Sequence, residues 1–245
     1  MKTTVMLVHG AFADSSSWND VAERLAADGH RVIAYANPLR SVAGDAAGLT
    51  ELVRTVDGPV VLAGHSYGGA VVSNVPADAG DVVSLVYVAA FALEAGESPG
   101  AAAGLVPGGT LGETLQLVPL PGGGADAYIA RAKFHEQFCA DLPARRAAVM
   151  AVTQRPIAEQ ALLEPSGPNP LWKSVPSWFI FGDQDRNIPA GAQRIMAERA
   201  NAQHTVEIAG ASHVVAVSHP SETADVILEA CAAAVANRKA ERTHA

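Results

Sequence analysis

The sequence predicts an α/β fold: a doubly wound, parallel, six-stranded sheet with helices on both faces. Short apolar runs rich in β-branched residues alternate with segments of helical periodicity over residues 2–90, and again over residues 177–235. The connections between these segments are short, which is typical of parallel strands joined by crossover helices. The carboxyl ends of such strands lie at one edge of the sheet, and ligands bind there.

The first part of the chain alternates strands with helices. Strands are expected at residues 2–8, 31–35, 60–63 and 82–90. Helices are expected between them, at about residues 18–28, 43–56 and 68–76. Gly29 ends the first of these helices, because glycine readily adopts the left-handed conformation that follows a helix.

The last part of the chain returns to the same alternation. Strands are expected at residues 177–181 and 204–208, and helices at about 189–200 and 220–235. Pro189 suits the first turn of its helix, where no hydrogen-bonded N–H is needed. The charged residues that follow position 236 predict a frayed tail.

Residues 94–176 break this rhythm with several runs of glycine and proline. A short hairpin around residues 115–118 and 128–138 is expected there, followed by helices near 143–153 and 156–163. The segment has too many apolar side chains for a disordered linker. We therefore expect a core of residues 1–93 and 177–245, with residues 94–176 as a cap insertion over the strand ends.

Length and charge limit the possible partners. The chain has 245 residues, 17% of them charged, and a formal net charge of -8. An acidic balance argues against nucleic acid or an anionic membrane surface as a partner, because both attract a basic face. The first apolar run is too short for an export signal, and the longest, residues 82–93, falls short of the ~20 residues of a membrane helix. A cytoplasmic location is expected.

The two cysteines, Cys139 and Cys231, lie far apart and in no metal-ligand spacing. No metal site is expected from them. Two free thiols are the simpler interpretation, although the sequence alone leaves a disulfide open.

The stretch Gly64-His65-Ser66-Tyr67-Gly68 follows an apolar strand and precedes a small-residue helix. In this G-x-S-x-G pattern a serine sits on a sharp strand-to-helix turn, with its hydroxyl above the sheet. A packing device or a phosphate cradle is the alternative, but the spacing matches neither a Walker loop nor a dinucleotide fingerprint. Ser66 is therefore the expected nucleophile, and the side chain of His65 should point away from its hydroxyl.

A serine needs a base to accept its proton, and that base needs an acid to orient it. His213 follows the last expected strand, and Asp183 and Asp185 both follow the strand before it. The chain order serine, acid, histidine then matches the expected sheet edge. The residues themselves leave the choice between the two aspartates open.

Acyl transfer also needs donors for the oxyanion that develops on the carbonyl oxygen. The backbone N–H of Tyr67 is one candidate, because it follows the nucleophile. The N–H of Ala11, in the glycine turn after the first strand, is the other. His9 is expected to support this turn.

These motifs together resemble the α/β-hydrolase fold superfamily, and the resemblance spans nearly the whole chain. More closely, the chain looks like small bacterial serine esterases and the plant methylesterase and hydroxynitrile lyase branch. The matching residues are His9 to Phe12, Trp18, Gly29 and His30, Gly64 to Gly69, Gly182 to Asp185 with Pro189, and Ser212 with His213.

The resemblance implies particular roles. In that family the acid lies three residues after the glycine, which selects Asp185, and the first oxyanion amide maps to Ala11. Hydroxynitrile lyases of this branch carry a lysine beside the catalytic histidine and a threonine in the first loop, where Val214 and Ala11 stand here. Cyanohydrin cleavage is therefore not expected. Ser66 also argues against dehalogenases and epoxide hydrolases, which have an aspartate at that position.

The sequence thus predicts a cofactor-free serine esterase that cleaves a small carboxylic ester, as a monomer or homodimer. The alternatives are acyl transfer, perhydrolysis or lactone opening by the same residues, or a ligand sensor with little turnover. Aromatic side chains are expected to line the pocket or cap: Phe12, Phe91, Phe134, Phe138 and Trp172.

Overall fold

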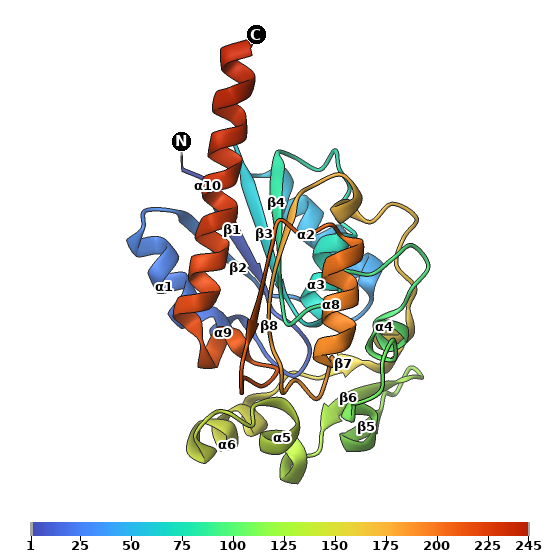
Figure 1. The fold of residues 1–245 in the computed structure, drawn as a ribbon. Helices are drawn as coiled ribbons and strands as arrows, with labels where there is room; N and C mark the ends of the chain where they lie inside the picture. The colour runs from blue at the N-terminus through green and yellow to red at the C-terminus, as the bar shows by residue number, and fades with distance from the viewer. Residues whose placement is uncertain (1, 245) are drawn as a thin grey trace.

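A computed structural model describes residues 2–244, with side chains for residues 2–236. Its main sheet has six parallel strands in the order β2-β1-β3-β4-β8-β9 (Figure 1). The strands are β1 (Thr4–Val8), β2 (Arg31–Tyr35), β3 (Val60–His65), β4 (Val82–Val88), β8 (Ser177–Gly182) and β9 (His204–Ile208). The predicted six-stranded parallel sheet is confirmed.

Helices cover both faces of this sheet. One face carries α1 (Asn19–Ala27) and α10 (Pro220–His244) (Figure 1). The other carries α2 (Val42–Arg54), α3 (Tyr67–Ser73) and α8 (Ala190–Arg199). Every residue of β1, β3 and β8 is buried, as the central strands of a doubly covered sheet require, whereas the edge strands β2 and β9 are partly exposed.

The chain between β4 and β8 forms a second, smaller layer beyond the carboxyl ends of the strands (Figure 1). It contains a three-stranded antiparallel sheet, β5-β6-β7, and several short helices. Its elements are α4 (Pro99–Ala103), β5 (Leu115–Pro119), β6 (Ala125–Ile129), α5 (Arg131–Phe138), α6 (Ala144–Thr153), β7 (Ile157–Ala158) and α7 (Glu159–Leu163). Single turns of 3₁₀ helix occur at Ser15–Trp18, Leu111–Thr114 and Leu171–Lys173, and α9 (Val215–Ser218) precedes α10.

The structure corrects three expectations about element boundaries. The second hairpin strand ends at Ile129, and α5 follows because Phe134 and Phe138, four residues apart, are both buried on one helix face. Residues 157–158 pair with β6 before α7 begins, so they are not helical. The last helix continues to His244, beyond the expected end near residue 235, through a segment rich in helix-forming alanine, arginine, lysine and glutamate.

Polar contacts attach the insertion to the loop that follows β2 and to the start of α2. Arg40 pairs with Asp126 of β6 at 2.6 Å and also donates to the carbonyl of Pro156 at 3.0 Å. Glu164 accepts from the first backbone N–H groups of α2, at 2.5 and 3.1 Å. Such a carboxylate satisfies donors that the helix itself leaves unpaired. The insertion is thereby fixed to one segment of the core, residues 40–43.

Within residues 2–244, no helix has both the length and the apolar character needed to cross a bilayer.

Gly68 sets the distance between α3 and β1. A Cβ added there would lie 2.3 Å from the carbonyl oxygen of Val8, a backbone atom that cannot move alone. We expect Gly68→Ala to lower the free energy of unfolding by about 2 to 4 kcal/mol. The measurement is urea unfolding beside Gly122→Ala, since a Cβ at Gly122 meets no atom within 4 Å. Equal stability of the two variants would contradict this packing constraint.

Candidate active site

Ser66 occupies the single position between β3 and α3. Its backbone has φ 54 and ψ -123, a conformation that residues with a Cβ rarely adopt. The loop after β1 comes directly against it, because a Cβ at Gly10 would lie 2.6 Å from Ser66 Cβ. The sharp turn leaves Ser66 7% exposed at the wall of a cavity, and its hydroxyl forms no hydrogen bond with any described residue.

Asp185 lies in the loop after β8, and its side chain is completely buried. Oδ1 accepts the backbone N–H groups of Asn187 and Ile188, at 2.8 and 2.9 Å. Oδ2 accepts from Gln193 Nε2 at 2.9 Å and from His213 Nδ1 at 2.7 Å. Four donors thus compensate the loss of water around a buried carboxylate.

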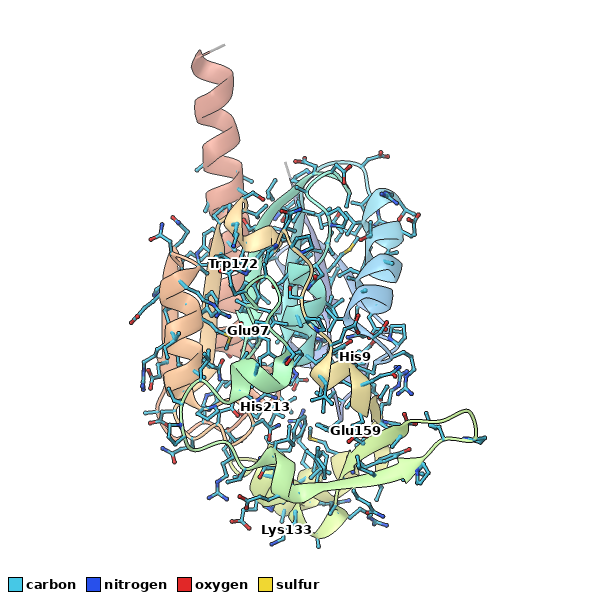
Figure 2. The ribbon with its side chains drawn as sticks, turned by 90° about the vertical axis from the view of Figure 1, so that its right-hand side faces the viewer. His9, Glu97, Lys133, Glu159, Trp172 and His213 are labelled. Atoms are coloured by element: carbon cyan, nitrogen blue, oxygen red, sulfur yellow. The ribbon has the colours of Figure 1, made fainter. Side chains whose placement is uncertain are left out.

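His213 lies in the loop between β9 and α9, and its side chain is also completely buried. Because Nδ1–H donates to Asp185, the neutral ring carries its lone pair on Nε2. No described residue donates a hydrogen bond to this nitrogen. The aromatic ring of Phe138 packs against the imidazole with ring centroids 5.3 Å apart. Figure 2 shows His213 at the level where the core meets the insertion.

His65 supports the loop that carries His213. Its Nε2–H donates to the backbone carbonyl of His213 at 3.1 Å, and the two rings are 4.8 Å apart. Burial, and then the nearby His213, lower the pKa of His65 to about 3. A carbonyl can only accept, so the His65 ring is neutral with its proton on Nε2.

Two backbone N–H groups lie beside Ser66 without an acceptor among the described residues. Tyr67 begins α3, so its N–H has no partner within the helix. The N–H of Ala11 likewise forms no backbone hydrogen bond, whereas the backbone N–H of Phe12 donates to the backbone carbonyl of Arg155 at 3.0 Å. Asn37 holds the loop through a 3.0 Å bond to the carbonyl of His9. Burial lowers the pKa of His9, whose ring donates only to the Gly10 carbonyl.

A cavity of about 370 Å³ opens above Ser66. Core and insertion both contribute to it, and none of its lining residues has a charged side chain. The lining residues are Ala11, Phe12, Ser66, Tyr67, Phe91, Pro99, Gly100, Ala103, Gly104, Gly109, Leu111, Gly112, Leu115, Leu162, Leu163, Asn187 and Ile188. Such a surface favours an uncharged, largely apolar ligand.

A second groove, of about 560 Å³, is larger but more open, and lies between the first 3₁₀ turn and α6. Phe12 contributes to both spaces. Ser66 does not line this groove, and His213 lines neither space. The smaller cavity is therefore the one associated with the serine.

The aromatic residues expected at the pocket fall into two groups. Phe12 and Phe91 line the cavity. Phe134 and Phe138 are fully buried and pack on each other, so they stand behind the site and not in its wall. Trp172 donates to the carbonyl of Leu93 at 2.8 Å and lies beside the core, away from His213 (Figure 2).

Of the two aspartates left open by the sequence, Asp185 is the one hydrogen-bonded to His213. Asp183 instead accepts the backbone N–H of Gly210 at 2.7 Å. Its carboxylate closes the turn after β9.

Several polar residues of this region were not found by sequence reasoning. Gln193, Asn187 and Asn37 are buried beside the residues already described. Gln193 shares a buried helix face with Ala192, Met196 and Ala197. A polar residue at an apolar position of the expected helix is the sequence feature that could have identified it. Asn187 had no comparable signal, because loop positions carry no periodicity.

Within the part of the chain that the structure describes, no group of three or more His, Cys, Asp or Glu side chains could hold a metal ion. Cys139 and Cys231 are free and buried. Burial raises the pKa of the Cys139 thiol to about 12, which makes it a poor nucleophile.

The chain belongs to the alpha/beta hydrolase family, whose model matches residues 5–226. This confirms the resemblance expected from the sequence. Among solved structures it is similar to polyneuridine aldehyde esterase, at 20% identity over 94% of this chain and 99% of that chain, with a TM-score of 0.78.

Two further structures show the same fold. A pyrethroid hydrolase from Sphingobium faniae JZ-2 is 20% identical over 94% of this chain and 97% of its own, with a TM-score of 0.72. A methylesterase from Arabidopsis is 17% identical over 93% and 98%, with a TM-score of 0.70. No curated protein matches the sequence significantly.

The low pKa of His65 predicts acid sensitivity. Between about pH 3 and 6.5 the unfolded chain binds a proton on this residue and the folded chain does not, so the free energy of unfolding rises with pH. In His65→Gln, the slope of the free energy of unfolding against pH should be smaller by up to about 1.4 kcal/mol per pH unit. Urea unfolding of both proteins from pH 4 to 8 measures this difference. Parallel curves would show that His65 is protonated in the folded protein.

Proposed function

We propose that this protein is a serine hydrolase that cleaves a small, uncharged carboxylic ester through an acyl-enzyme. The observation that carries the proposal is the buried pair of Asp185 and His213, whose Nε2 has no partner among the described residues. The ring of His213 lies 4.8 Å from that of His65, the residue before a serine on a strained turn. Membership of the alpha/beta hydrolase family supports it. Two of the similar structures, at 20% and 17% identity, are named as an esterase and a methylesterase, which agrees with it.

In the proposed first step, Ser66 Oγ attacks the ester carbonyl carbon while its proton passes to His213 Nε2. Asp185 keeps the proton of the neutral ring on Nδ1 and stabilises the imidazolium that forms. The tetrahedral intermediate then collapses, and the leaving alcohol takes the proton from Nε2. Water repeats the sequence on the acyl-enzyme and releases the acid. This chemistry requires no cofactor.

The backbone N–H groups of Ala11 and Tyr67 would bind the oxyanion. Both residues line the cavity next to Ser66. Loss of one such donor raises the barrier by about 3 kcal/mol in a serine protease. Gly10 matters to this arrangement because any side chain there would separate the Ala11 loop from Ser66.

The rings around His213 suit this role. His65 is neutral, so it adds no positive charge beside the imidazolium that must form. Phe138 excludes water from one side of the ring. In a site with little water, the attraction between Asp185 and a protonated His213 is stronger than it would be in bulk solvent.

A fluorophosphonate probe and a series of p-nitrophenyl esters graded by acyl length test the proposal. We expect covalent labelling at Ser66, steady turnover of short esters, and a loss of at least about 10⁴-fold in Ser66→Ala. Labelling without steady turnover would indicate a ligand sensor instead. Esterase activity that survives in a folded Ser66→Ala protein would refute the proposed nucleophile.

The two aspartates provide a matched pair of variants. Asp185→Asn should reduce kcat by about 10⁴-fold, because the amide favours the wrong tautomer of His213. Asp183→Asn should retain most of the activity, since Asp183 contacts only the turn at Gly210. Steady-state kinetics on one ester, with circular dichroism as a folding control, compares them. A larger loss in Asp183→Asn would assign the acid to that residue.

A further inference from the structure

Asn187 is a polar residue at the border of the largely apolar cavity above Ser66. It lies in the loop between β8 and α8, is only 4% exposed, and lines the cavity. Tyr67 also lines the cavity, but its hydroxyl donates to Asp45 Oδ2 at 2.9 Å. The lining residues are mostly glycine, alanine, leucine and phenylalanine, and Asn187 is the one among them with a side-chain amide.

A hydrogen-bond network determines which way the Asn187 amide faces. Gln137, from α5 of the insertion, approaches the backbone carbonyl of Arg186 at 3.0 Å. A carbonyl only accepts, so the Gln137 atom there must be the nitrogen Nε2. The same Nε2 donates to Asn187 at 2.7 Å, which identifies the Asn187 atom as Oδ1. The hydroxyl of Thr110 donates to Gln137 Oε1 at 2.8 Å.

The opposite end of the Asn187 amide is therefore its NH₂ group. No described residue accepts a hydrogen bond from Nδ2. This nitrogen is not among the fully buried polar atoms that lack a partner, so it retains accessible surface. Because Asn187 is only 4% exposed and borders the cavity, we assign that surface to the cavity. With this assignment, the two N–H donors of Asn187 are available to an acceptor in the cavity.

We propose that Asn187 is a specificity residue that donates a hydrogen bond to a second oxygen of the substrate. The inference rests on the proposed ester hydrolysis. It narrows the substrate class to neutral esters that carry, apart from the ester group, an uncharged acceptor such as an ether or ketone oxygen in the part that fills the cavity. An anionic group is excluded from this class because no cation lines the cavity. Gln137 is the positioning residue that holds the amide in this orientation.

Two series of esters test the proposal. One comprises p-nitrophenyl hexanoate and its 3-oxa, 4-oxa and 5-oxa analogues, and the other comprises hexyl acetate with the matching ethers in its alcohol part. The quantity compared is the kcat/KM ratio of ether to hydrocarbon, measured in the parent and in Asn187→Leu. Dividing the two ratios cancels the intrinsic reactivity of each ester. For at least one oxygen position, we expect the ether-to-hydrocarbon ratio to be about fivefold to tenfold lower in Asn187→Leu than in the parent.

Variants of the network sharpen the test. In Gln137→Glu the carboxylate cannot donate to Asn187 Oδ1, so the amide should turn and present that oxygen to the cavity. The preferred ether should then lose its advantage, and the analogue with a hydroxyl at the same position should gain. Thr110→Val is the matched control. It removes one hydroxyl but keeps both bonds from Gln137 Nε2, so the preference should stay within about twofold.

Binding measurements separate this inference from the proposed hydrolysis. Dissociation constants of the same esters are measured by calorimetry for Ser66→Ala and for Ser66→Ala/Asn187→Leu. The ether preference should appear in the first protein and vanish in the second, even if the parent hydrolyses none of the esters. An equal loss for ethers and hydrocarbons in Asn187→Leu would overturn the inference, because Asn187 would then only support the Asp185 loop. The same conclusion follows if no oxygen position is preferred in either kinetics or binding.

Discussion

The hydrogen bond between Asp185 and His213 is the interaction on which the candidate site depends. Both side chains are fully buried, and they come from the loops after two neighbouring strands, β8 and β9. A buried carboxylate is tolerated only where donors replace its lost water, and here two backbone N–H groups and Gln193 join His213 in that role. The local fold after β8 is therefore organised around one carboxylate.

Ser66 lies at the same edge of the sheet as this pair because the sheet is parallel. Strands β3, β8 and β9 all end at the same edge, so the residues that follow them lie along that edge although they are distant in sequence. The positive φ of Ser66 is maintained by close packing around the turn, where Gly10 lies against Ser66 and Gly68 lies against Val8 of β1, with no space for a Cβ at either glycine. Strain of this kind persists only where the surrounding structure holds it in place.

The insertion completes the site from above. Phe138 covers His213, Gln137 orients Asn187, and residues of α4, α7 and the loop before β5 close the cavity. Arg40 and Glu164 fix this layer to the core through charged contacts. The insertion thus contributes part of the cavity wall, whereas the core supplies Ser66, Asp185 and His213. Structures with the same fold, at about 20% identity, can therefore differ in what they accept.

The sequence by itself determined the features that depend on local pattern. Alternating apolar runs and helical segments were enough to predict the parallel sheet, because burial on both faces leaves a continuous apolar signature in each central strand. The glycines around Ser66 predicted the turn for a similarly local reason. Within the insertion, where strands are short and exposed, the hairpin was expected but its second strand was extended into what is helix α5.

Only the tertiary structure decided which distant side chains meet. The residues left Asp183 and Asp185 open, and resemblance alone favoured Asp185, which the structure pairs with His213. Gln137 and Asn187 lie 50 positions apart, and no periodicity connects them. The direction in which the Asn187 amide faces depends on the carbonyl of Arg186, an obligate acceptor brought near by packing. Contacts of this kind arise from three-dimensional proximity, so a linear pattern cannot contain them.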